Sequence, residues 1–365
     1  MRIDPALFQE NERTQPTKDE RRYAQIGDLQ TESGTLIPDV TIAYETWGTL
    51  NPAKDNAILL CHALSGDSHA IGWWDRLVGP GKPFDTGRFF VIGSNCLGGC
   101  QGSTGPSSIA PDGKPWATRF PLITVGDMVE AQIRLIRSLG IETLFCVGGG
   151  SMGGMQALEW TRRGSVKKCF ITGSSAAHSA MQIGFNEVAR QAVMRDAKWL
   201  GGNYPPDDPP NGGLAISRMI GHISFLSEMA FESKFGREVK KTVLGYDSTV
   251  NRHPPTASPL FQVESYLNYQ GDKFTKRFDA NSLLYLTKAI DLYDCQSLQG
   301  SSSEYLFVSF TSDWLYPAHQ AETLHKMARA AGCKSHWANI DLPYGHDAFL
   351  LDGEHQGAEL RKFLS

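Results

Sequence analysis

Near its middle the chain reads Leu144-Phe145-Cys146-Val147-Gly148-Gly149-Gly150-Ser151-Met152-Gly153-Gly154-Met155-Gln156. The apolar residues stop at glycines, a serine follows, and the residues after the serine are able to form a helix. This order predicts a strand, a tight turn and a helix, with a Gly-x-Ser-x-Gly pattern at the turn. Glycines are needed there because larger side chains would clash with the strand and the helix. We therefore expect Ser151 at the C-terminal end of the strand, in a strained backbone conformation.

A serine in this position is typical of a catalytic nucleophile. The turn holds its hydroxyl outward, and backbone N–H groups at the helix N-terminus are able to stabilise an oxyanion. Such a nucleophile elbow is found in enzymes of the α/β-hydrolase type. The alternative is a glycine-rich turn that binds nothing or holds a phosphate group. The apolar strand before Ser151 and the helical pattern after it favour the elbow.

An acid and a histidine should follow such a serine in chain order, each just after a later strand. Residues 304–310 are apolar and predict a strand, and Asp313 stands in the loop after it. Another apolar segment lies near residues 337–342, and His346 stands in the loop that follows. The three residues would thus meet at one edge of a parallel sheet. We expect His346 to take the proton of Ser151, and Asp313 to fix the imidazole tautomer and stabilise its charged form.

Each of these residues also has a purely structural interpretation. Asp313 would serve as the N-cap of a helix that begins near Pro317, and Asp347 as the N-cap of a short turn. His346 would be a surface histidine. No single residue decides between the two interpretations, but three residues in this order and at these strand ends together favour a catalytic triad.

An oxyanion hole needs a second backbone donor, from a loop after an earlier strand. Residues 57–62 are apolar and predict that strand, and residues 63–67 form the loop. We therefore expect the backbone N–H groups of Leu64 and Met152 to form the hole. This assignment rests on position alone, because backbone donors leave little side-chain pattern.

Strands and helices alternate through most of the chain, which is typical of an α/β fold with a mostly parallel, doubly wound sheet. Strands are predicted near residues 58, 90, 145, 170, 307 and 337, with an early antiparallel strand at 40–46, and helices at 125–139, 152–163, 318–331 and 356–363. The first thirty or so residues are polar, and we expect them to be partly disordered or to lie over the surface.

The alternation breaks between residues 177 and 297, a segment too long for a simple crossover. Helical patterns at 185–200, 213–235 and 274–293 are separated there by the proline-rich residues 205–210 and 253–255. We predict an α/β-hydrolase core of residues 1–176 and 298–365, with residues 177–297 inserted as a helical lid. A lid above the strand ends would make a deep, dry pocket over Ser151.

The composition is that of an ordinary globular protein, with 41% hydrophobic and 20% charged residues among 365. A net charge of -4 favours neither nucleic acid nor an anionic membrane as a partner, and no apolar run is long enough to span a membrane. The seven cysteines are scattered, and Cys96 and Cys100 stand without a second pair, so no metal site is predicted. Scattered cysteines and a polar N-terminus without a signal core predict a cytoplasmic protein.

Several longer blocks resemble a known family, the homoserine O-acetyltransferases of methionine biosynthesis, a branch of the α/β-hydrolase superfamily. Two of them are Cys61-His62-Ala63-Leu64-Ser65-Gly66-Asp67 and Tyr344-Gly345-His346-Asp347-Ala348-Phe349. The other matching blocks are residues 42–51, 95–100, 103–108, 149–156, 261–267 and 278–282. The resemblance therefore covers nearly the whole chain and is far more specific than the serine motif.

The resemblance implies a ping-pong reaction in which Ser151 takes the acetyl group from acetyl-CoA and passes it to the hydroxyl of L-homoserine. It implies no bound cofactor, and a homodimer that forms through the lid. It also implies that Asp347 pairs with the substrate ammonium group and Arg218 with its carboxylate, which a guanidinium is able to grip bidentately. The alternative for Arg218 is a solvated arginine on a helix.

The chain departs from the family pattern at two positions. Many members carry Tyr where this chain has Phe225, so a substrate contact of that hydroxyl would be missing or supplied elsewhere. Ser65 stands where Thr is usual. A third position concerns the acyl donor. Relatives that use succinyl-CoA resemble an arginine-bearing pattern at the second residue after the triad aspartate, and this chain has Leu315 there. An apolar side chain does not offset the cost of burying a free carboxylate, so acetyl-CoA is the predicted donor.

Other functions remain open on the sequence. The chain would also suit a homoserine or serine O-succinyltransferase. The two acceptors, L-homoserine and L-serine, differ by one methylene, which is worth only about 1–3 kcal/mol in a pocket. An esterase or thioesterase would use the same triad, and a non-catalytic binding protein the same fold. The long lid and the pair of Arg218 and Asp347 favour transfer over hydrolysis, and the intact triad argues against a non-catalytic protein.

Overall fold

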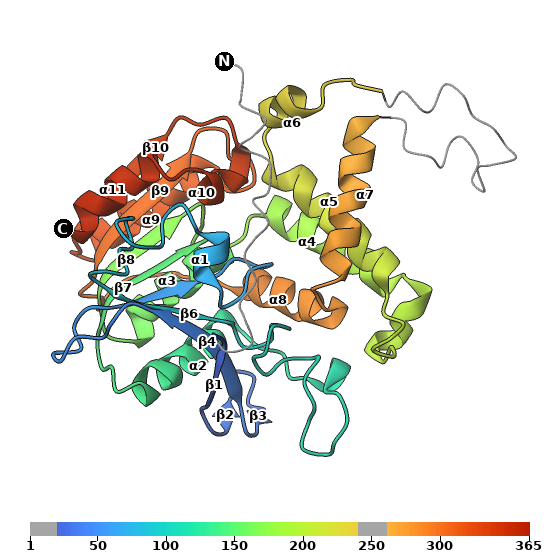
Figure 1. Cartoon of the computed structure of the whole chain (residues 1–365), viewed down its shortest axis with the longest axis horizontal. Helices are drawn as coiled ribbons and strands as arrows, with labels where there is room; N and C mark the ends of the chain where they lie inside the picture. The colour runs from blue at the N-terminus through green and yellow to red at the C-terminus, as the bar shows by residue number, and fades with distance from the viewer. Residues whose placement is uncertain (1–19, 240–260) are drawn as a thin grey trace, which may run out of the picture.

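The computed structural model describes residues 20–239 and 261–365. Its centre is an eight-stranded sheet in the order β1-β4-β6-β5-β7-β8-β9-β10 (Figure 1). The strands in that order are β1 Arg22–Gln25, β4 Thr41–Trp47, β6 Phe90–Ser94, β5 Ala57–Cys61, β7 Leu144–Gly150, β8 Val166–Thr172, β9 Glu304–Phe310 and β10 Ser335–Ile340. At one edge β1 pairs antiparallel with β4, and β4 pairs antiparallel with β6. From β6 to β10 all neighbouring strands are parallel. The predicted α/β fold with a mostly parallel sheet is confirmed.

The sheet has a packed core on each face, because alternate residues of a strand point to opposite sides. In β5, Leu59 belongs to one apolar cluster and Leu60 to the other. The first cluster holds residues of α2 Val125–Ser138, α3 Met152–Arg163 and α9 Ala318–Ala330, and the second holds residues of α1 Ala70–Trp73, α10 Ala348–Leu351 and α11 His355–Leu364. The doubly wound arrangement follows from these two layers of helices.

The order in which successive strands are added to the sheet reverses at β5. From β5 the chain passes to β6 on one side, and it then crosses back to β7 on the other side of β5. In open α/β sheets such a switch point leaves a crevice at the C-terminal ends of the strands, where ligands bind. Ser151 follows β7 directly and therefore stands at this crevice.

The N-terminal prediction was wrong in part. Residues 22–25, expected to be partly disordered or to lie over the surface, form β1, whose register pairs Arg22 with Tyr44 of β4. A small second sheet follows, made of β2 Leu29–Gln30 and β3 Leu36–Ile37. The remainder of the prediction, on residues 1–19, lies outside the described residues.

Helices fill the segment between β8 and β9, which we call the insertion helices, and Figure 1 shows them gathered to one side of the sheet. They are α4 Ala180–Met194, α5 Asn211–Phe225, α6 Glu228–Lys234, α7 Gln262–Thr275 and α8 Ala280–Leu292. Short 3-10 helices also occur at Ala117–Arg119, Ala197–Gly202 and Gly345–Asp347 (η2, η3 and η6). The proline-rich residues 253–255, predicted to separate helices, lie outside the described residues.

The predicted insertion helices had wrong boundaries where polar caps intervene. The pattern at 213–235 is two helices, because Leu226 is extended and the Ser227 hydroxyl accepts a hydrogen bond from the Ala230 N–H at 3.0 Å. The helix predicted at 274–293 begins only at Ala280, because Asp279 caps α8 by accepting a hydrogen bond from the Ser282 N–H at 2.7 Å. The pattern at 185–200 ends early, at Met194, and a 3-10 turn follows.

No helix in the described part of the chain combines the length and the apolar character that a membrane crossing requires.

Candidate active site

Ser151 occupies the strained turn that the sequence predicts. Its φ of 55° and ψ of -125° are unfavourable for a residue with a side chain. Its N–H is held by the carbonyl oxygens of Thr172 and Gly173, at 3.1 and 3.2 Å. A methyl group on Gly153 would lie 2.0 Å from the carbonyl oxygen of Cys61, so only glycine fits where α3 passes the end of β5. The glycine pattern is therefore explained by close backbone packing.

Asp313 and His346 are brought together by the loops after β9 and β10. The Nδ1 atom of His346 lies 2.8 Å from Oδ2 of Asp313, and both side chains are buried. The other oxygen of Asp313 accepts the N–H groups of Leu315 and Tyr316, at 3.1 and 2.8 Å. Because the carboxylate accepts the Nδ1–H of His346, the Nε2 atom of that ring keeps its lone pair, as a general base requires.

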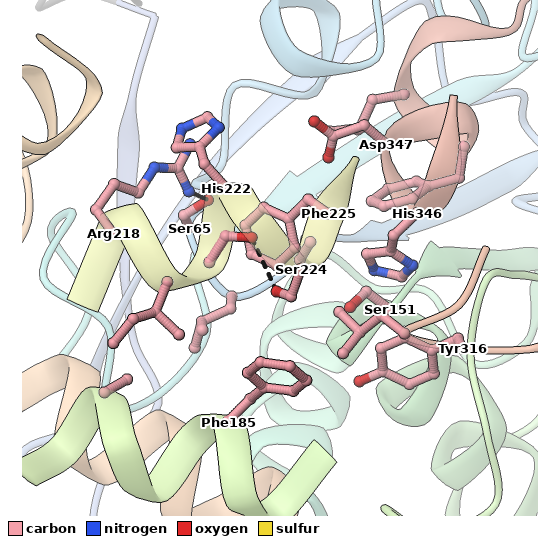
Figure 2. Close-up of a pocket in the computed structure, with 18 of the residues that line it drawn as sticks. Ser65, Ser151, Phe185, Arg218, His222, Ser224, Phe225, Tyr316, His346 and Asp347 are labelled. Atoms are coloured by element: carbon pink, nitrogen blue, oxygen red, sulfur yellow. Dashed lines mark hydrogen bonds between the residues drawn. The ribbon is translucent and has the colours of Figure 1, made fainter. Parts of the chain in front are cut away.

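The purely structural roles considered for Asp313, His346 and Asp347 are a helix cap, a surface histidine and a turn cap. Asp313 is not the cap of α9, whose N-cap residue is Pro317, although it does cap the turn of its own loop. His346 is not a surface residue, since only 3% of it is exposed. Asp347 precedes α10 without a capping hydrogen bond from its side chain. Figure 2 shows Ser151 next to the His346 ring, with Asp347 pointing away from both.

Tyr316 is a residue of this site that sequence reasoning missed. Its ring stacks on that of His346, with 4.7 Å between centroids and 20° between planes. Its hydroxyl lies 2.7 Å from Nε2 of His178, and burial raises the pKa of Tyr316 well above its usual range. The phenol is therefore neutral. The only signal in the sequence was its place, three residues after Asp313 and next to a proline.

The two predicted oxyanion donors lie on adjoining segments. Met152 is the first residue of α3, where a backbone N–H has no acceptor within the helix. Leu64 lines the same cavity as Ser151. The loop of Leu64 is anchored by His62, whose Nδ1 lies 2.7 Å from the Ala63 carbonyl oxygen and whose Nε2 accepts the N–H of a neighbouring loop.

That anchoring role of His62 needs a neutral ring. One nitrogen donates to Ala63 and the other accepts the N–H of Cys96 at 3.0 Å, so a second proton would break the latter contact. Complete burial lowers the pKa of His62, which keeps the ring neutral. Sequence reasoning missed His62, although it stands directly after a buried strand and at the start of the oxyanion loop.

A cavity of about 210 Å³ lies above Ser151, between the core and the insertion helices, and it contains the predicted substrate residues. Arg218 projects from α5, and its Nη1 donates to the Ser65 hydroxyl at 3.3 Å. The Arg218 guanidinium lies 5.1 Å from the centroid of the Phe274 ring. Asp347 enters from the turn η6, on the other side of the view in Figure 2. The cavity thus carries a cation, Arg218, and an anion, Asp347, from separate elements, and Asp75 and Arg76 also line it.

The positions that depart from the family pattern also line this cavity. Leu315 is 7% exposed and lines the cavity. The Phe225 ring lies 6.0 Å from the His346 ring, so it covers the histidine with an apolar surface. Ser65 is the hydrogen-bond partner of Arg218, so its replacement of Thr keeps a hydroxyl at that contact.

Comparisons with known proteins agree with this geometry. The family model described as alpha/beta hydrolase fold matches residues 56–352. The homoserine O-acetyltransferase of Solidesulfovibrio magneticus is 46% identical, over 94% of this chain and 92% of that protein. The crystal structure of homoserine O-acetyltransferase from Bacillus anthracis has a TM-score of 0.86 at 28% identity, covering 95% of this chain and 97% of that one. The crystal structure of esterase E22 is similar too, with a TM-score of 0.85 at 29% identity, covering 95% of this chain and 100% of the other.

Proposed function

The chain belongs to the homoserine O-acetyltransferase family of the α/β-hydrolase fold, and from this premise we propose that it transfers an acetyl group from acetyl-CoA to the hydroxyl of L-homoserine. The products are O-acetyl-L-homoserine and CoA. One observation carries the proposal: a strained serine, the histidine of a buried His–Asp pair, the cation of Arg218 and the anion of Asp347 all line a single cavity. The charged pair matches the two charges of an amino-acid zwitterion.

In the first half-reaction the Ser151 oxygen attacks the acetyl carbonyl carbon, and His346 takes the serine proton. The carbonyl oxygen becomes an oxyanion that the N–H groups of Leu64 and Met152 stabilise. The C–S bond then breaks, and His346 returns the proton to the departing CoA thiolate. Asp313 stabilises the imidazolium throughout, because its carboxylate lies 2.8 Å from Nδ1.

In the second half-reaction His346 removes the proton of the homoserine hydroxyl, and the oxygen attacks the acetyl carbon on Ser151. The bond between the acetyl carbon and the Ser151 oxygen then breaks, and His346 returns the proton to Ser151. Arg218 holds the substrate carboxylate and Asp347 holds its ammonium group, which places the hydroxyl at the acyl-enzyme. The insertion helices, residues 177–297 in our domain proposal, act as a lid over the residues 1–176 and 298–365. Apolar lining residues such as Phe225 keep water from competing for the acetyl group.

Acetyl-CoA is the proposed donor because of the surroundings of Leu315. Among the described residues that line the cavity, the lysines and arginines are Arg76, which is exposed, and Arg218, which is assigned to the acceptor. A succinyl carboxylate beside Leu315 would therefore be buried without a cation to offset its desolvation.

A homodimer through the insertion helices is part of the proposal. Met181 and Val188 are exposed and seven residues apart on α4, and Ile216 and Ile223 have the same relation on α5. Residues seven apart share a helix face, so each helix carries an exposed apolar stripe. Such stripes on neighbouring helices are typical of a protein interface.

We also propose that the enzyme works in the cytoplasm. All seven cysteines fall within the described residues, and all are free, as expected where thiols stay reduced.

Thiol release measures the proposed reaction directly. Acetyl-CoA and succinyl-CoA are each supplied without an acceptor, with L-homoserine and with L-serine. Rapid release that needs both acetyl-CoA and L-homoserine supports the proposal. Release from acetyl-CoA alone at the same rate would make the protein a thioesterase, an outcome to which the similarity with esterase E22 gives weight. A preference for succinyl-CoA or L-serine would overturn the choice of substrates while leaving the triad in place.

A further inference from the structure

The segment that carries Leu64 is a tight turn of residues 63–66, which we call the Leu64 turn. The Gly66 N–H donates to the carbonyl oxygen of Ala63 at 2.8 Å and closes the turn. Its four residues are only partly buried, and they belong to no helix or strand. This local hydrogen bond shapes the turn but does not fix its direction relative to Ser151, so contacts from outside the turn must do so.

Two arginines from the insertion segment reach the same residue of the Leu64 turn. Arg277, between α7 and α8, donates from Nη1 to the carbonyl oxygen of Ser65 at 2.8 Å. Arg218, on α5, donates from Nη1 to the Ser65 hydroxyl at 3.3 Å, and Figure 2 shows these two side chains together. Both guanidiniums pack on the ring of Phe274, 5.4 Å from its centroid for Arg277 and 5.1 Å for Arg218. One arginine therefore holds the backbone of the turn, and the other holds its side chain.

The two arginines differ in their access to the cavity. Among the described residues, the lining of the cavity includes Arg218 and Ser65 but not Arg277. A substrate in the cavity is therefore able to reach Arg218 directly. Arg277 is able to influence that substrate only through the turn whose carbonyl oxygen it holds.

The backbone of Arg277 is itself fixed to the core loop that follows β6. The carbonyl oxygen of Arg277 accepts hydrogen bonds from Nε2 of Gln101 and from Sγ of Cys100, the latter at 3.9 Å. His62 uses the same loop, since its Nε2 accepts the Cys96 N–H at 3.0 Å while its Nδ1 contacts the first carbonyl oxygen of the turn. His62 and Arg277 thus tie two carbonyl oxygens of the turn to one loop of the core.

We propose that Arg277 is a positioning residue for acyl transfer: by holding the Ser65 carbonyl oxygen, it keeps the Leu64 N–H directed at the oxyanion. During acylation the Ser151 oxygen bonds to the acyl carbon, and the electron pair of the carbonyl double bond moves to the acyl oxygen, which the Leu64 N–H stabilises. Arg277 exchanges no proton and contacts no substrate. The inference rests on the proposed function in taking Ser151 as the nucleophile and the Leu64 N–H as an oxyanion donor.

Arg277→Met tests the proposal, because methionine keeps an unbranched side chain against Phe274 and removes the donor. The pre-steady-state burst with p-nitrophenyl acetate has an amplitude that counts active sites and a rate that reports acylation per site. We expect the burst rate to fall about tenfold, less than the roughly 10²–10³-fold effect of losing a whole oxyanion donor, with unchanged KM for the ester. A purely structural role would lower the burst amplitude and the melting temperature but leave the rate per site unchanged, and that result would overturn the proposal.

Arg277→Lys should recover most of the burst rate, since an ammonium group also donates to a carbonyl oxygen. A lysine variant as slow as Arg277→Met would contradict a role for the donor. Lys276→Ala is the matched control, because it removes a cation from the same turn between α7 and α8, where the Lys276 side chain is exposed. Its burst rate should equal that of the wild type.

Acceptor kinetics separate the role of Arg277 from that of Arg218. Both half-reactions pass through an oxyanion and should slow alike in Arg277→Met, so kcat for thiol release should fall while KM for L-homoserine stays unchanged. Loss of the Arg218 guanidinium should instead raise KM for L-homoserine. A raised KM with a normal burst rate in Arg277→Met would make Arg277 a substrate-binding residue and overturn the proposal.

The ester burst and thiol release together separate this inference from the proposed function. If the wild type shows a burst with the ester but releases no thiol from acetyl-CoA, the proposed acyltransferase activity fails. A slower burst in Arg277→Met would then still support the positioning role. If the wild type transfers acetyl groups and its burst rate equals that of Arg277→Met, the positioning role fails and the proposed function stands.

Discussion

The Nδ1 atom of His346 lies 2.8 Å from Oδ2 of Asp313, while the other carboxylate oxygen accepts two backbone N–H groups of its own loop. Asp313→Asn retains the shape of the side chain but is able to present an amide N–H to the imidazole, which then adopts the wrong tautomer. We expect kcat for thiol release from acetyl-CoA to fall about 10⁴-fold, the size seen when the acid of such triads is amidated.

Asp294→Asn is the control for this variant, because Asp294 is exposed and far in sequence from the triad loops. It should keep full activity, and both variants should melt close to the wild type. A loss of less than tenfold in Asp313→Asn would show that Asp313 is a loop cap and not the acid of the triad.

The contact between Arg218 and Ser65 predicts a role on the acceptor side only. Arg218→Ala should raise KM for L-homoserine about 10- to 100-fold, the loss of a charge-assisted hydrogen bond, and leave the acetylation burst with p-nitrophenyl acetate unchanged. Steady-state kinetics and the burst together measure both effects. Arg195→Ala, on the exposed end of α4, should change neither. A slower burst in Arg218→Ala would assign Arg218 to acylation instead.

Much of the core could be predicted because local pattern and tertiary structure agree there. The helix after Ser151 and the strand before Asp313 have the bounds that the sequence predicted, Met152–Arg163 and Glu304–Phe310. A run of apolar residues that is followed by glycines or by a loop with an aspartate is favoured as a buried strand of a parallel sheet. The order of Ser151, Asp313 and His346 then places all three at one sheet edge.

The buried hydrogen bond between Tyr316 and His178 could not be predicted from the sequence. His178 and Tyr316 are 138 residues apart, and neither stands in a pattern that marks a hydrogen bond. The breaks within the insertion helices were missed for a related reason. Ser227 and Asp279 are ordinary polar residues in a helical pattern until packing makes them caps.

Leu315 predicts donor selectivity. The wild type should use acetyl-CoA at least about 100-fold better than succinyl-CoA in kcat/KM, since burying an unpaired carboxylate costs several kcal/mol. Leu315→Arg should narrow this ratio, and the volume-conserving Leu315→Met should keep it. Thermal melting checks that the buried arginine has not unfolded the protein. A wild type that uses both donors equally would show that Leu315 does not select the acyl group.

His62 predicts a pH dependence of stability. Burial depresses its pKa in the folded state below the ordinary value of 6.5, so the unfolded chain takes up the proton first as the pH falls. The stabilising contribution is therefore complete above pH 6.5 and is lost as the pH falls from there toward the folded-state pKa. In His62→Gln the melting temperature should depend less on pH between about 7 and 5 than in the wild type. His336→Gln, whose parent side chain is 65% exposed, should follow the wild-type curve.

The elbow itself predicts opposite effects for two glycine substitutions in helices. Gly153→Ala would place a methyl group 2.0 Å from the carbonyl oxygen of Cys61, a backbone atom that cannot move without displacing β5. We expect it to lower the free energy of unfolding by about 3 kcal/mol or more and to remove the acetylation burst, because the N–H of Met152 moves with the helix. Gly184→Ala, on α4, meets no atom within 4 Å and should stabilise the protein by about 0.5–1 kcal/mol with no change in the burst. Denaturant unfolding and burst amplitudes measure both, and a fully active Gly153→Ala would mean that close contact between α3 and β5 is not what holds the nucleophile.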